Sequence, residues 1–475
     1  MEALVPDHVD TADLGNGLRG CEHEVDGAAR PDGKERFRHL LAERTQPGSE
    51  ARSEDECVHD CLRLVPEEER GRARERQAPA ASIRTIMSII AGECDPAFGA
   101  VRSAFSENFS ERDESGASLC ILVGGRCVVD LWGGHRDSGK TRPWERDTLV
   151  NAWSVGKGIL ALLALTLVER GRLSLDAPVH TLWPEFAAAG KGGITLRTLL
   201  SHRAGLPSVR KRLPDEAWQD WAAMCDAYAE QEPWWEPDRD HGYHVNSYGF
   251  LVGELVRRST GLSPGAALQE ALAGPLDADF YWGVPGSEHA RVAHVDFPNR
   301  ILRGPEEWAL AFPATGDAEH DTMIWHAYFN PPGLSGTGAM GTPEWLRAEI
   351  PSTNGQATAR GVARLYDAIL RPSPLGPPPV GAELLAEATR IHSDGDDRVL
   401  GRPSRFGLGF QLPSPTRPLG PNDAAFGHYG YGGLLGLADP EADVAFAFLT
   451  ARPGDRWRTP RTQALLDALY GALGA

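Results

Sequence analysis

Apolar residues follow two different periods along the chain, and the changes between them predict where strands and helices lie. From Phe98 to Phe109 they recur at helical spacing. Residues 117–134 (ASLCILVGGRCVVDLWGG) then form two apolar runs around a pair of glycines, which is typical of a β-hairpin. Near the end of the chain, an amphipathic helix is predicted over 461–473, after strands predicted at 405–412, 432–441 and 443–452.

Between these two ends the pattern is helical and interrupted by Gly and Pro, with helices predicted over 194–207, 215–231, 247–261, 263–274 and 358–370. Strands at both ends with helices between them predict an α+β fold, an α/β sandwich. One antiparallel sheet, built from both chain ends, would be flanked by helices and joined by a mostly helical inserted domain. We place the folded domain at 95–475, with sheet-containing parts at 95–195 and 400–475 and the mostly helical part at 196–399.

Residues 1–86 differ from the rest of the chain. They are dense in Asp, Glu and Arg, poor in aromatic residues and without sustained periodicity, which predicts a charged, disordered extension. Within it, Cys57, His59 and Cys61 (CVHDC) lack a second pair of ligands, so we assign no metal there. The seven cysteines are odd in number and irregularly spaced, and they suggest no disulfide framework.

The length and net charge of the chain exclude some classes of function. With 475 residues and a formal net charge of -18, the chain is large enough for a sizeable core and poorly suited to nucleic acid or an anionic membrane. Neither a secretory signal nor a long enough apolar run for a membrane span is visible in the sequence. We therefore expect a cytoplasmic protein that acts on a small molecule.

The most reactive combination lies in residues 151–171 (NAWSVGKGILALLALTLVERG), where Ser154 precedes Lys157 at the start of an apolar helix. Residues three apart share one helix face, so the hydroxyl and amine lie one turn apart. A buried amine loses solvation, its pKa falls, and it can accept the serine proton. The helix N-terminus also directs N–H groups at the site. The alternative is an N-cap serine and a lysine whose charged end reaches solvent.

Two other serines compete for this role. Ser208 precedes Lys211 at the same spacing, but in a basic loop without an apolar helix behind it, so we interpret that pair as coincidence. Ser263 in GLSPG fits the nucleophile elbow of α/β-hydrolases, which requires a strand before the serine. Here a helix precedes it and Pro264 follows, which is typical of an N-cap with proline at the first helical position.

Two stretches later in the sequence could contribute to the same site as Ser154 and Lys157. Tyr243 stands five residues before the apolar helix that starts at Tyr248, although it could equally be a half-buried loop aromatic. Residues 426–441 (FGHYGYGGLLGLADPE) are typical of an edge strand whose glycines admit another backbone or a ligand. The alternative there is a glycine-rich hairpin.

In this order, S-x-x-K, LLSHRAGLP, a tyrosine before YGFLVGE, and GHYGYGG resemble the serine β-lactamase-like superfamily. Within it they are similar to class C β-lactamases, DD-peptidases and family VIII carboxylesterases. The resemblance spans roughly residues 95–475 and implies a β-lactamase/transpeptidase-like fold. It also implies that Ser154 is the acylated nucleophile, Lys157 its proton acceptor, and Tyr243 the group that shares base work and protonates the leaving group. No metal or organic cofactor is implied.

The same resemblance implies a substrate-binding strand. His428, Tyr429 and Gly430 stand where many relatives have Lys-Thr-Gly, and the oxyanion hole would be formed by the backbone N–H groups of Ser154 and Tyr431. His202 and Arg203, in LLSHRAGLP, are interpreted as fixing a helix C-terminus rather than touching substrate.

The sequence departs from these relatives in two places. Val245 replaces the Asn of their Tyr-x-Asn motif, with Asn246 one position later, and His428 replaces the lysine that helps to hold a substrate carboxylate. A mostly neutral imidazole attracts an anion less. Both changes favour a serine hydrolase of small, uncharged carboxylic esters. The alternatives are a β-lactamase or D-amino-acid peptidase, and a non-catalytic penicillin-binding-like module.

Overall fold

The computed structural model describes residues 90–297, 300–309, 311–454 and 457–474. The predicted extension 1–86, with its CVHDC stretch, lies outside the described residues. Residues 305–315, with helix α12 (Pro305–Trp308), belong to a separate unit and are described only by themselves.

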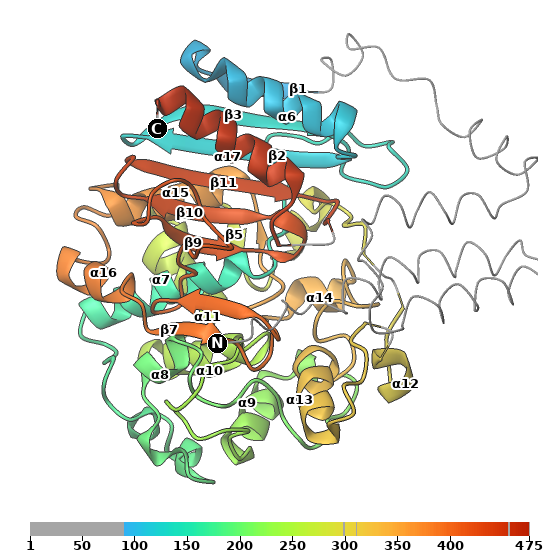
Figure 1. Cartoon of the computed structure of the whole chain (residues 1–475), viewed down its shortest axis with the longest axis vertical. Coiled ribbons are helices and arrows are strands. Elements are labelled where there is room, and N and C mark those ends of the chain that lie inside the picture. The colour runs from blue at the N-terminus through green and yellow to red at the C-terminus, as the bar shows by residue number, and fades with distance from the viewer. Residues whose placement is uncertain (1–89, 298–299, 310, 455–456, 475) are drawn as a thin grey trace, which may run out of the picture. The chain divides into compact units, whose positions relative to one another are not determined.

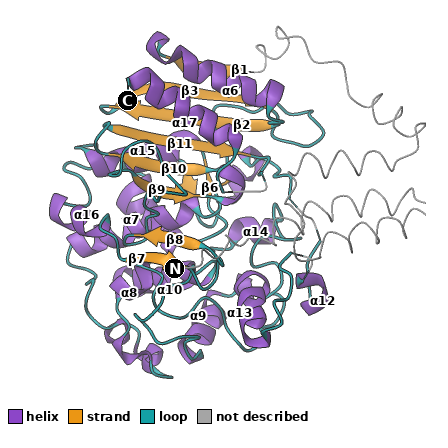
Figure 2. Cartoon of the chain, viewed as in Figure 1, coloured by secondary structure: helices purple, strands orange, loops and turns teal. Residues whose placement is uncertain are grey.

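A six-stranded antiparallel sheet joins the two ends of the described chain, in the order β1-β3-β2-β11-β10-β9 (Figures 1 and 2). The predicted sheet from both chain ends is therefore confirmed. The sheet also contains a strand before residue 95, which the sequence analysis missed. The strands are β1 (Ile90–Cys94), β2 (Gly116–Val123), β3 (Arg126–Gly134), β9 (Phe426–Tyr429), β10 (Leu435–Asp439) and β11 (Val444–Thr450).

Both faces of this sheet are covered, because side chains alternate along each strand. On β2, Leu119 and Ile121 pack into the apolar cluster shared with helices α6 (Gly99–Glu111) and α17 (Pro460–Leu473). Cys120 and Leu122 face the opposite cluster, with α7 (Val155–Glu169) and α15 (Ala359–Leu370). We call these the α17 face and the α7 face. Figure 2 shows α6 and α17 crossing one side of the sheet.

Helix α7 is the central helix of the fold. All its side chains from Val155 to Leu167 are buried, because Leu, Ile and Ala occupy nearly every position after the first turn. It packs against β9 and β10 on one side and against helix α10 (Ser247–Thr260) on the other. The first turn of α7 therefore lies where the edge strand β9 meets the helical part of the chain.

The helical part contains α8 (Leu196–Leu200), α9 (Trp221–Glu230), α10, α11 (Pro264–Leu268), α13 (Ala318–Phe329), α14 (Pro343–Arg347) and α16 (Ala382–Ala388). A π-helical turn, Gln269–Ala273, extends α11. Three short strands pair in the order β4-β6-β5: β4 (Val150–Asn151), β6 (Gln356–Ala357) and β5 (Phe280–Tyr281). Two further strands, β7 (Ser393–Asp396) and β8 (Pro403–Phe406), form a separate hairpin.

Two of the predicted elements end well before their expected last residue. The helix predicted over 194–207 ends at Leu200, because His202 adopts a left-handed φ of 61°. The strand predicted over 405–412 ends at Phe406, because the chain bends through Gly407 and Gly409. A Cβ at Gly407 would lie 2.2 Å from the Ala388 carbonyl oxygen, and Gly409 has a φ of 83°. Both endings depend on local backbone conformations that periodicity does not encode.

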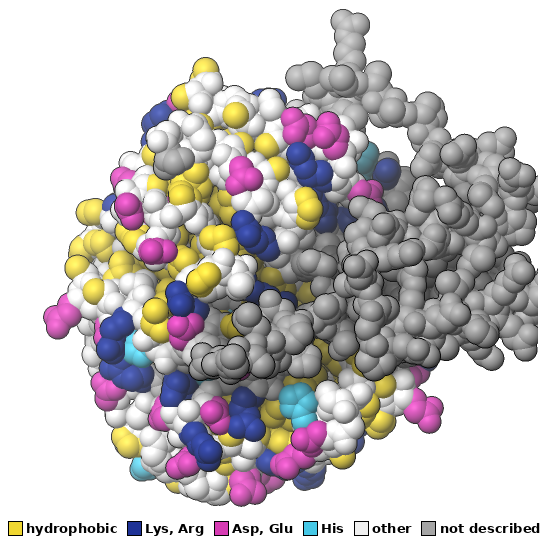
Figure 3. All heavy atoms as spheres, in the orientation of Figure 1, with side chains coloured by type: hydrophobic (Ala, Val, Ile, Leu, Met, Phe, Trp, Pro, Cys, Tyr) yellow, Lys and Arg dark blue, Asp and Glu magenta, His cyan; other side chains and the backbone are white. Residues whose placement is uncertain are grey.

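The described surface carries mixed charge. On the face in Figure 3, basic and acidic side chains are interspersed, without a continuous basic patch. Among the helices of the described residues, none is both long and apolar enough to cross a bilayer.

Candidate active site

Ser154 is held on a tight turn that connects β4 to α7. Trp153 before it has a left-handed φ of 51°, a strained conformation for a bulky residue. Backbone bonds from Val155, Gly156 and Lys157 each reach back three residues, at 3.2, 3.0 and 3.0 Å. Although Ser154 stands at the N-cap position, its hydroxyl makes no capping hydrogen bond. The side chain is therefore available for chemistry.

Lys157 is the partner of that hydroxyl. Its Nζ lies 3.0 Å from Ser154 Oγ and 3.0 Å from the carbonyl oxygen of Ser352, and the side chain is fully buried. Burial lowers the pKa of this amine well below its usual value. The Ser352 carbonyl can only accept, so one N–H of Lys157 is committed to it. The lone pair of the neutral amine remains for the Ser154 proton.

Tyr243 lies beside this pair. Lys157 Nζ is 4.8 Å from the centroid of the Tyr243 ring. The Tyr243 hydroxyl is buried, and no described residue forms a hydrogen bond with it. Burial raises the pKa of this phenol well above its usual value, and the nearby Ser154 hydroxyl opposes that shift only in part. Tyr243 thus remains protonated and is suited to donate a proton.

His428 enters the same site from the edge strand β9. Its Nδ1 lies 2.7 Å from the Tyr429 carbonyl oxygen, an acceptor only, so Nδ1 carries the proton. Its ring centroid is 6.0 Å from that of Tyr243, and its buried Nε2 has no hydrogen-bond partner among the described residues. Burial, followed by the proximity of Lys157, lowers the pKa of His428 to about 3. It is therefore a neutral group with an unprotonated Nε2.

Two glycines bring β9 against the start of α7. A Cβ at Gly158 would lie 2.3 Å from the Tyr366 hydroxyl oxygen and 3.4 Å from His428 Cβ. A Cβ at Gly430 would lie 2.8 Å from the Ala152 carbonyl oxygen. The strand that carries His428 therefore passes directly alongside the turn that carries Ser154.

The residues after His428 take different positions. Tyr429 packs into the cluster on the α17 face, so its side chain lies across the sheet from His428 and only its backbone borders the site. Tyr431 is 42% exposed, and its ring centroid lies 5.2 Å from that of Trp153 and 5.7 Å from that of Phe297. Trp153 and Phe297 also contact each other, at 4.7 Å. Three aromatic rings therefore flank the turn of Ser154.

Val245 and Asn246 are both buried. The Asn246 amide nitrogen donates to the Ala327 carbonyl and to the Ser335 hydroxyl, at 2.8 Å each. Its oxygen accepts from Thr353 at 2.6 Å. Both N–H donors of Asn246 and one lone pair of its oxygen are used within the fold, so this amide offers a substrate no free N–H in place of the one that Val245 lacks.

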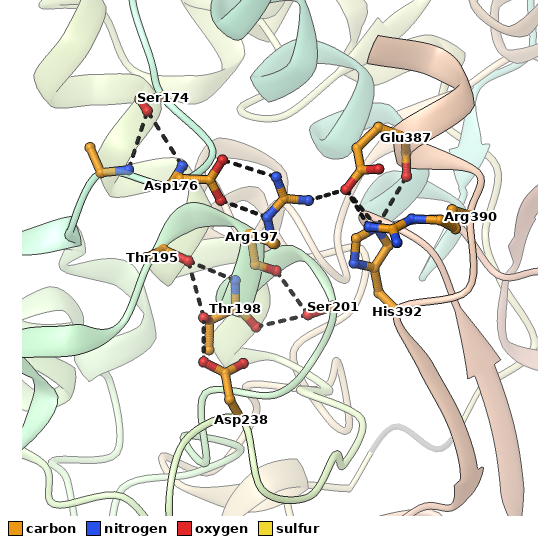
Figure 4. Close-up of polar contacts among 11 residues, drawn as sticks. Ser174, Asp176, Thr195, Arg197, Thr198, Ser201, Asp238, Glu387, Arg390 and His392 are labelled. Carbon is orange, nitrogen blue, oxygen red and sulfur yellow. Dashed lines mark hydrogen bonds and ion pairs between the residues drawn. The ribbon is translucent and has the colours of Figure 1, made fainter. Parts of the chain in front are cut away.

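His202 stands at the end of α8, where its N–H donates to the Leu199 carbonyl at 3.2 Å, and its ring makes a second contact. It follows α8, which is anchored on one side by Arg197, whose guanidinium pairs with Asp176 and Glu387 (Figure 4). The His202 ring then packs 5.1 Å from the ring of Tyr243. It therefore forms part of the support beneath Tyr243.

The competing serines are placed as predicted. Ser263 is an N-cap: its hydroxyl accepts from the Ala266 N–H at 3.3 Å and donates to Glu349 at 2.6 Å. Pro264 occupies the first helical position. Ser208 is buried and Lys211 is exposed, and no hydrogen bond joins their side chains in the described chain.

Two contributors to the site were not predicted from the sequence: the Ser352 carbonyl, and Asp397, which accepts a hydrogen bond from the Tyr243 N–H at 2.9 Å. A backbone carbonyl leaves no trace in residue identity. Asp397 stands in a charged run, DGDD, that looks like ordinary exposed loop. The described residues contain no group of three His, Cys, Asp or Glu side chains that could hold a metal ion.

The sequence and the fold of this chain are similar to those of known proteins. The family model described as Beta-lactamase matches residues 101–470. Esterase/beta-lactamase LipL of Mycobacterium tuberculosis is 33% identical over 365 residues, which cover 76% of this chain and 82% of LipL. The crystal structure of a family VIII carboxylesterase superposes with a TM-score of 0.72 at 36% identity, covering 81% of this chain and 99% of the other.

A penicillin-binding protein homologue from Caulobacter crescentus gives the same TM-score of 0.72 at 35% identity, again over 81% of this chain and 99% of the other. These matches extend across the sheet, the helical part and the turn of Ser154. The chain belongs to the beta-lactamase family.

Proposed function

We propose that the protein is a serine hydrolase that cleaves small, uncharged carboxylic esters through an acyl-enzyme on Ser154. The observation that carries this proposal is the 3.0 Å contact between Ser154 Oγ and the buried amine of Lys157. The esterases among the relatives, LipL and the family VIII carboxylesterase, support an ester as the substrate.

Acylation begins when Ser154 Oγ attacks the ester carbonyl and its proton passes to Lys157 Nζ. The carbonyl oxygen becomes an oxyanion between the N–H groups of Ser154, at the start of α7, and Tyr431, at the end of β9. As the C–O bond to the alcohol breaks, the Tyr243 hydroxyl protonates the departing oxygen. The Lys157 ammonium then returns a proton to the Tyr243 phenolate, and both groups are neutral again.

Deacylation runs through the same groups. Water attacks the acyl carbonyl while the neutral amine of Lys157 takes a water proton. Collapse of the tetrahedral species releases the carboxylic acid, and Ser154 Oγ regains its proton. The cycle requires no cofactor and leaves the enzyme unchanged.

His428 directs the choice of substrate. A neutral imidazole in the position of a lysine contributes no positive charge for a substrate carboxylate, and the committed Asn246 amide offers no replacement contact. Both features support uncharged esters over β-lactams and D-amino-acid peptides, which carry a carboxylate.

The test compares two serines by hydrolysis of p-nitrophenyl butanoate. Ser154→Ala should abolish turnover and labelling by a fluorophosphonate. Ser263→Ala removes a genuine helix cap, so it should cost about 1 kcal/mol of stability yet keep near wild-type activity. Activity that survives Ser154→Ala, or is lost with Ser263→Ala in a folded protein, would contradict the assignment. An unlabelled Ser154 in the wild type would favour a non-catalytic module.

A second candidate is β-lactam hydrolysis, which the relative esterase/beta-lactamase LipL supports. A chromogenic cephalosporin assayed beside the ester separates the two candidates. Turnover of the cephalosporin alone would favour the second.

A further inference from the structure

The backbone of Tyr243 is fixed by a segment far away in the sequence. Asp397, at the end of the β7–β8 hairpin's first strand, accepts the Tyr243 N–H on Oδ1 at 2.9 Å. The same oxygen accepts the N–H groups of Val399 and Leu400, each at 2.9 Å. The carboxylate is 2% exposed, so these bonds are sheltered from water.

The second carboxylate oxygen of Asp397 contacts β8, the other strand of the hairpin. Oδ2 accepts from the Ser404 hydroxyl at 2.7 Å. His241 Nε2 lies 3.0 Å from the same hydroxyl, and because the Ser404 proton is used by Asp397, His241 is the donor. No described Lys or Arg forms an ion pair with Asp397. Its carboxyl group instead accepts hydrogen bonds from three N–H groups and one hydroxyl.

Further contacts join the same two segments. The Arg398 N–H donates to the His241 carbonyl at 3.1 Å, and the Arg398 guanidinium pairs with Asp240 at 2.7 Å. At the end of β8, Phe406 stacks on the Tyr243 ring with an interplanar angle of 10° and a centroid distance of 5.8 Å. The hairpin therefore supports both the backbone and the ring of Tyr243.

Tyr243 has no comparable support at its reactive end, because its hydroxyl forms no hydrogen bond with a described residue. The position of that oxygen is thus set by the backbone anchor and by ring packing. We propose that Asp397 is a positioning residue for the reaction, which holds Tyr243 where its hydroxyl can protonate the leaving alcohol. This inference rests on the proposed function.

The leaving group separates positioning from general stability. An ethyl ester needs a proton on its departing alkoxide, whereas p-nitrophenolate leaves without one. With ethyl butanoate and p-nitrophenyl butanoate, which share one acyl group, Asp397→Ala should lower kcat/KM for the ethyl ester at least about tenfold more than for the p-nitrophenyl ester. Asp397→Asn keeps the Oδ1 acceptor and should restore the wild-type ratio to within about twofold.

Asp394→Asn is the matched control, because Asp394 lies on β7, is exposed and contacts Arg405 rather than Tyr243. It should leave both rates unchanged. If Asp397→Ala does not fold in a thermal melt, Asp397→Glu, which keeps the charge but displaces the carboxylate by one methylene, serves the same test. An equal loss for both esters, or an Asn variant as impaired as the Ala variant, would overturn the inference.

The two proposals fail in different ways. Persistent activity in Ser154→Ala would refute the proposed function itself. Loss of activity in Ser154→Ala, combined with equal losses for the two esters in the Asp397 variants, would refute only the role of Asp397.

Discussion

At the scale of single residues, the site depends on a lysine that has lost its charge. Lys157 is fully buried, and no carboxylate among the described residues pairs with it. A protonated amine in that place is costly, so the neutral form is favoured. The same burial keeps Tyr243 protonated and His428 neutral. One physical cause, desolvation, therefore favours the neutral forms that the proposed base, acid and substrate-binding residue require.

Lys157→Met should raise the free energy of unfolding and lower the esterase activity. Because burial lowers the pKa of Lys157, the folded chain holds this proton less tightly than the unfolded chain does, so below the ordinary lysine pKa this lysine lowers the free energy of unfolding. Methionine removes that effect. We expect a gain of about 1 kcal/mol at pH 7, which shrinks as pH rises toward the ordinary lysine pKa, and a loss of about 10²- to 10⁴-fold in kcat/KM.

Urea unfolding at two pH values and ester hydrolysis measure both effects. Lys211→Met, at an exposed lysine, should change neither. Retained activity in the Lys157 variant, or a stability difference that grows with pH, would contradict the argument.

At the scale of elements, the site is the contact between helix α7 and strand β9. Gly158 on α7 permits it, because a Cβ there would meet the Tyr366 hydroxyl oxygen at 2.3 Å and approach His428 Cβ at 3.4 Å. The Tyr366 hydroxyl is buried and forms no hydrogen bond with a described residue. Glycine in the middle of a helix is otherwise unfavourable, so its presence here reflects the close approach.

Gly158→Ala should destabilise the protein by about 1–3 kcal/mol through overpacking and should lower activity, because α15 or β9 must shift. Adding Tyr366→Phe removes the clashing oxygen and should recover most of that stability. Thermal melts and ester hydrolysis of both variants test this.

The matched control for this prediction is Gly99→Ala. Gly99 begins α6, and a Cβ there would contact nothing within 4 Å, so this variant should be neutral or slightly stabilising. If Gly158→Ala is as mild as Gly99→Ala, α7 and β9 are less tightly packed than the structure indicates.

At the scale of the whole molecule, buried histidines link stability to pH. Burial lowers the pKa of His202 well below its usual value, that of His244 to about 4 and that of His428 to about 3. Each is neutral in the folded protein but protonates near pH 6.5 when unfolded. Their stabilising contribution is thus present above pH 6.5 and is lost as pH falls below it.

Between pH 6.5 and 5, the free energy of unfolding should consequently decline, with a limiting slope of about 1.4 kcal/mol per pH unit for each histidine. His428→Asn should reduce this decline by the contribution of one histidine, measured by urea unfolding across that range, while exposed His294→Asn should not. A decline that is identical in wild type and His428→Asn would refute the linkage.

The fold was more predictable than the site. The hairpin over 117–134 and the terminal helix follow from periodicity, and both are present as β2, β3 and α17. Strand β1 was missed because its five residues, IAGEC, contain a glycine with a φ of 102° and show no clear alternation. The strand predicted from Arg405 was too long because the chain bends through Gly407 and Gly409, where Gly409 has a φ of 83°.

The sequence by itself determined that Ser154 and Lys157 lie together, since helix geometry brings residues three apart onto one face whatever surrounds them. Only the tertiary structure decided that this lysine is buried, that Tyr243 and His428 meet it from other elements, and that Tyr429 faces the opposite side of the sheet. It also placed Asp397 behind Tyr243. Local backbone geometry is encoded residue by residue, whereas desolvation and contacts between distant segments exist only once the chain has packed.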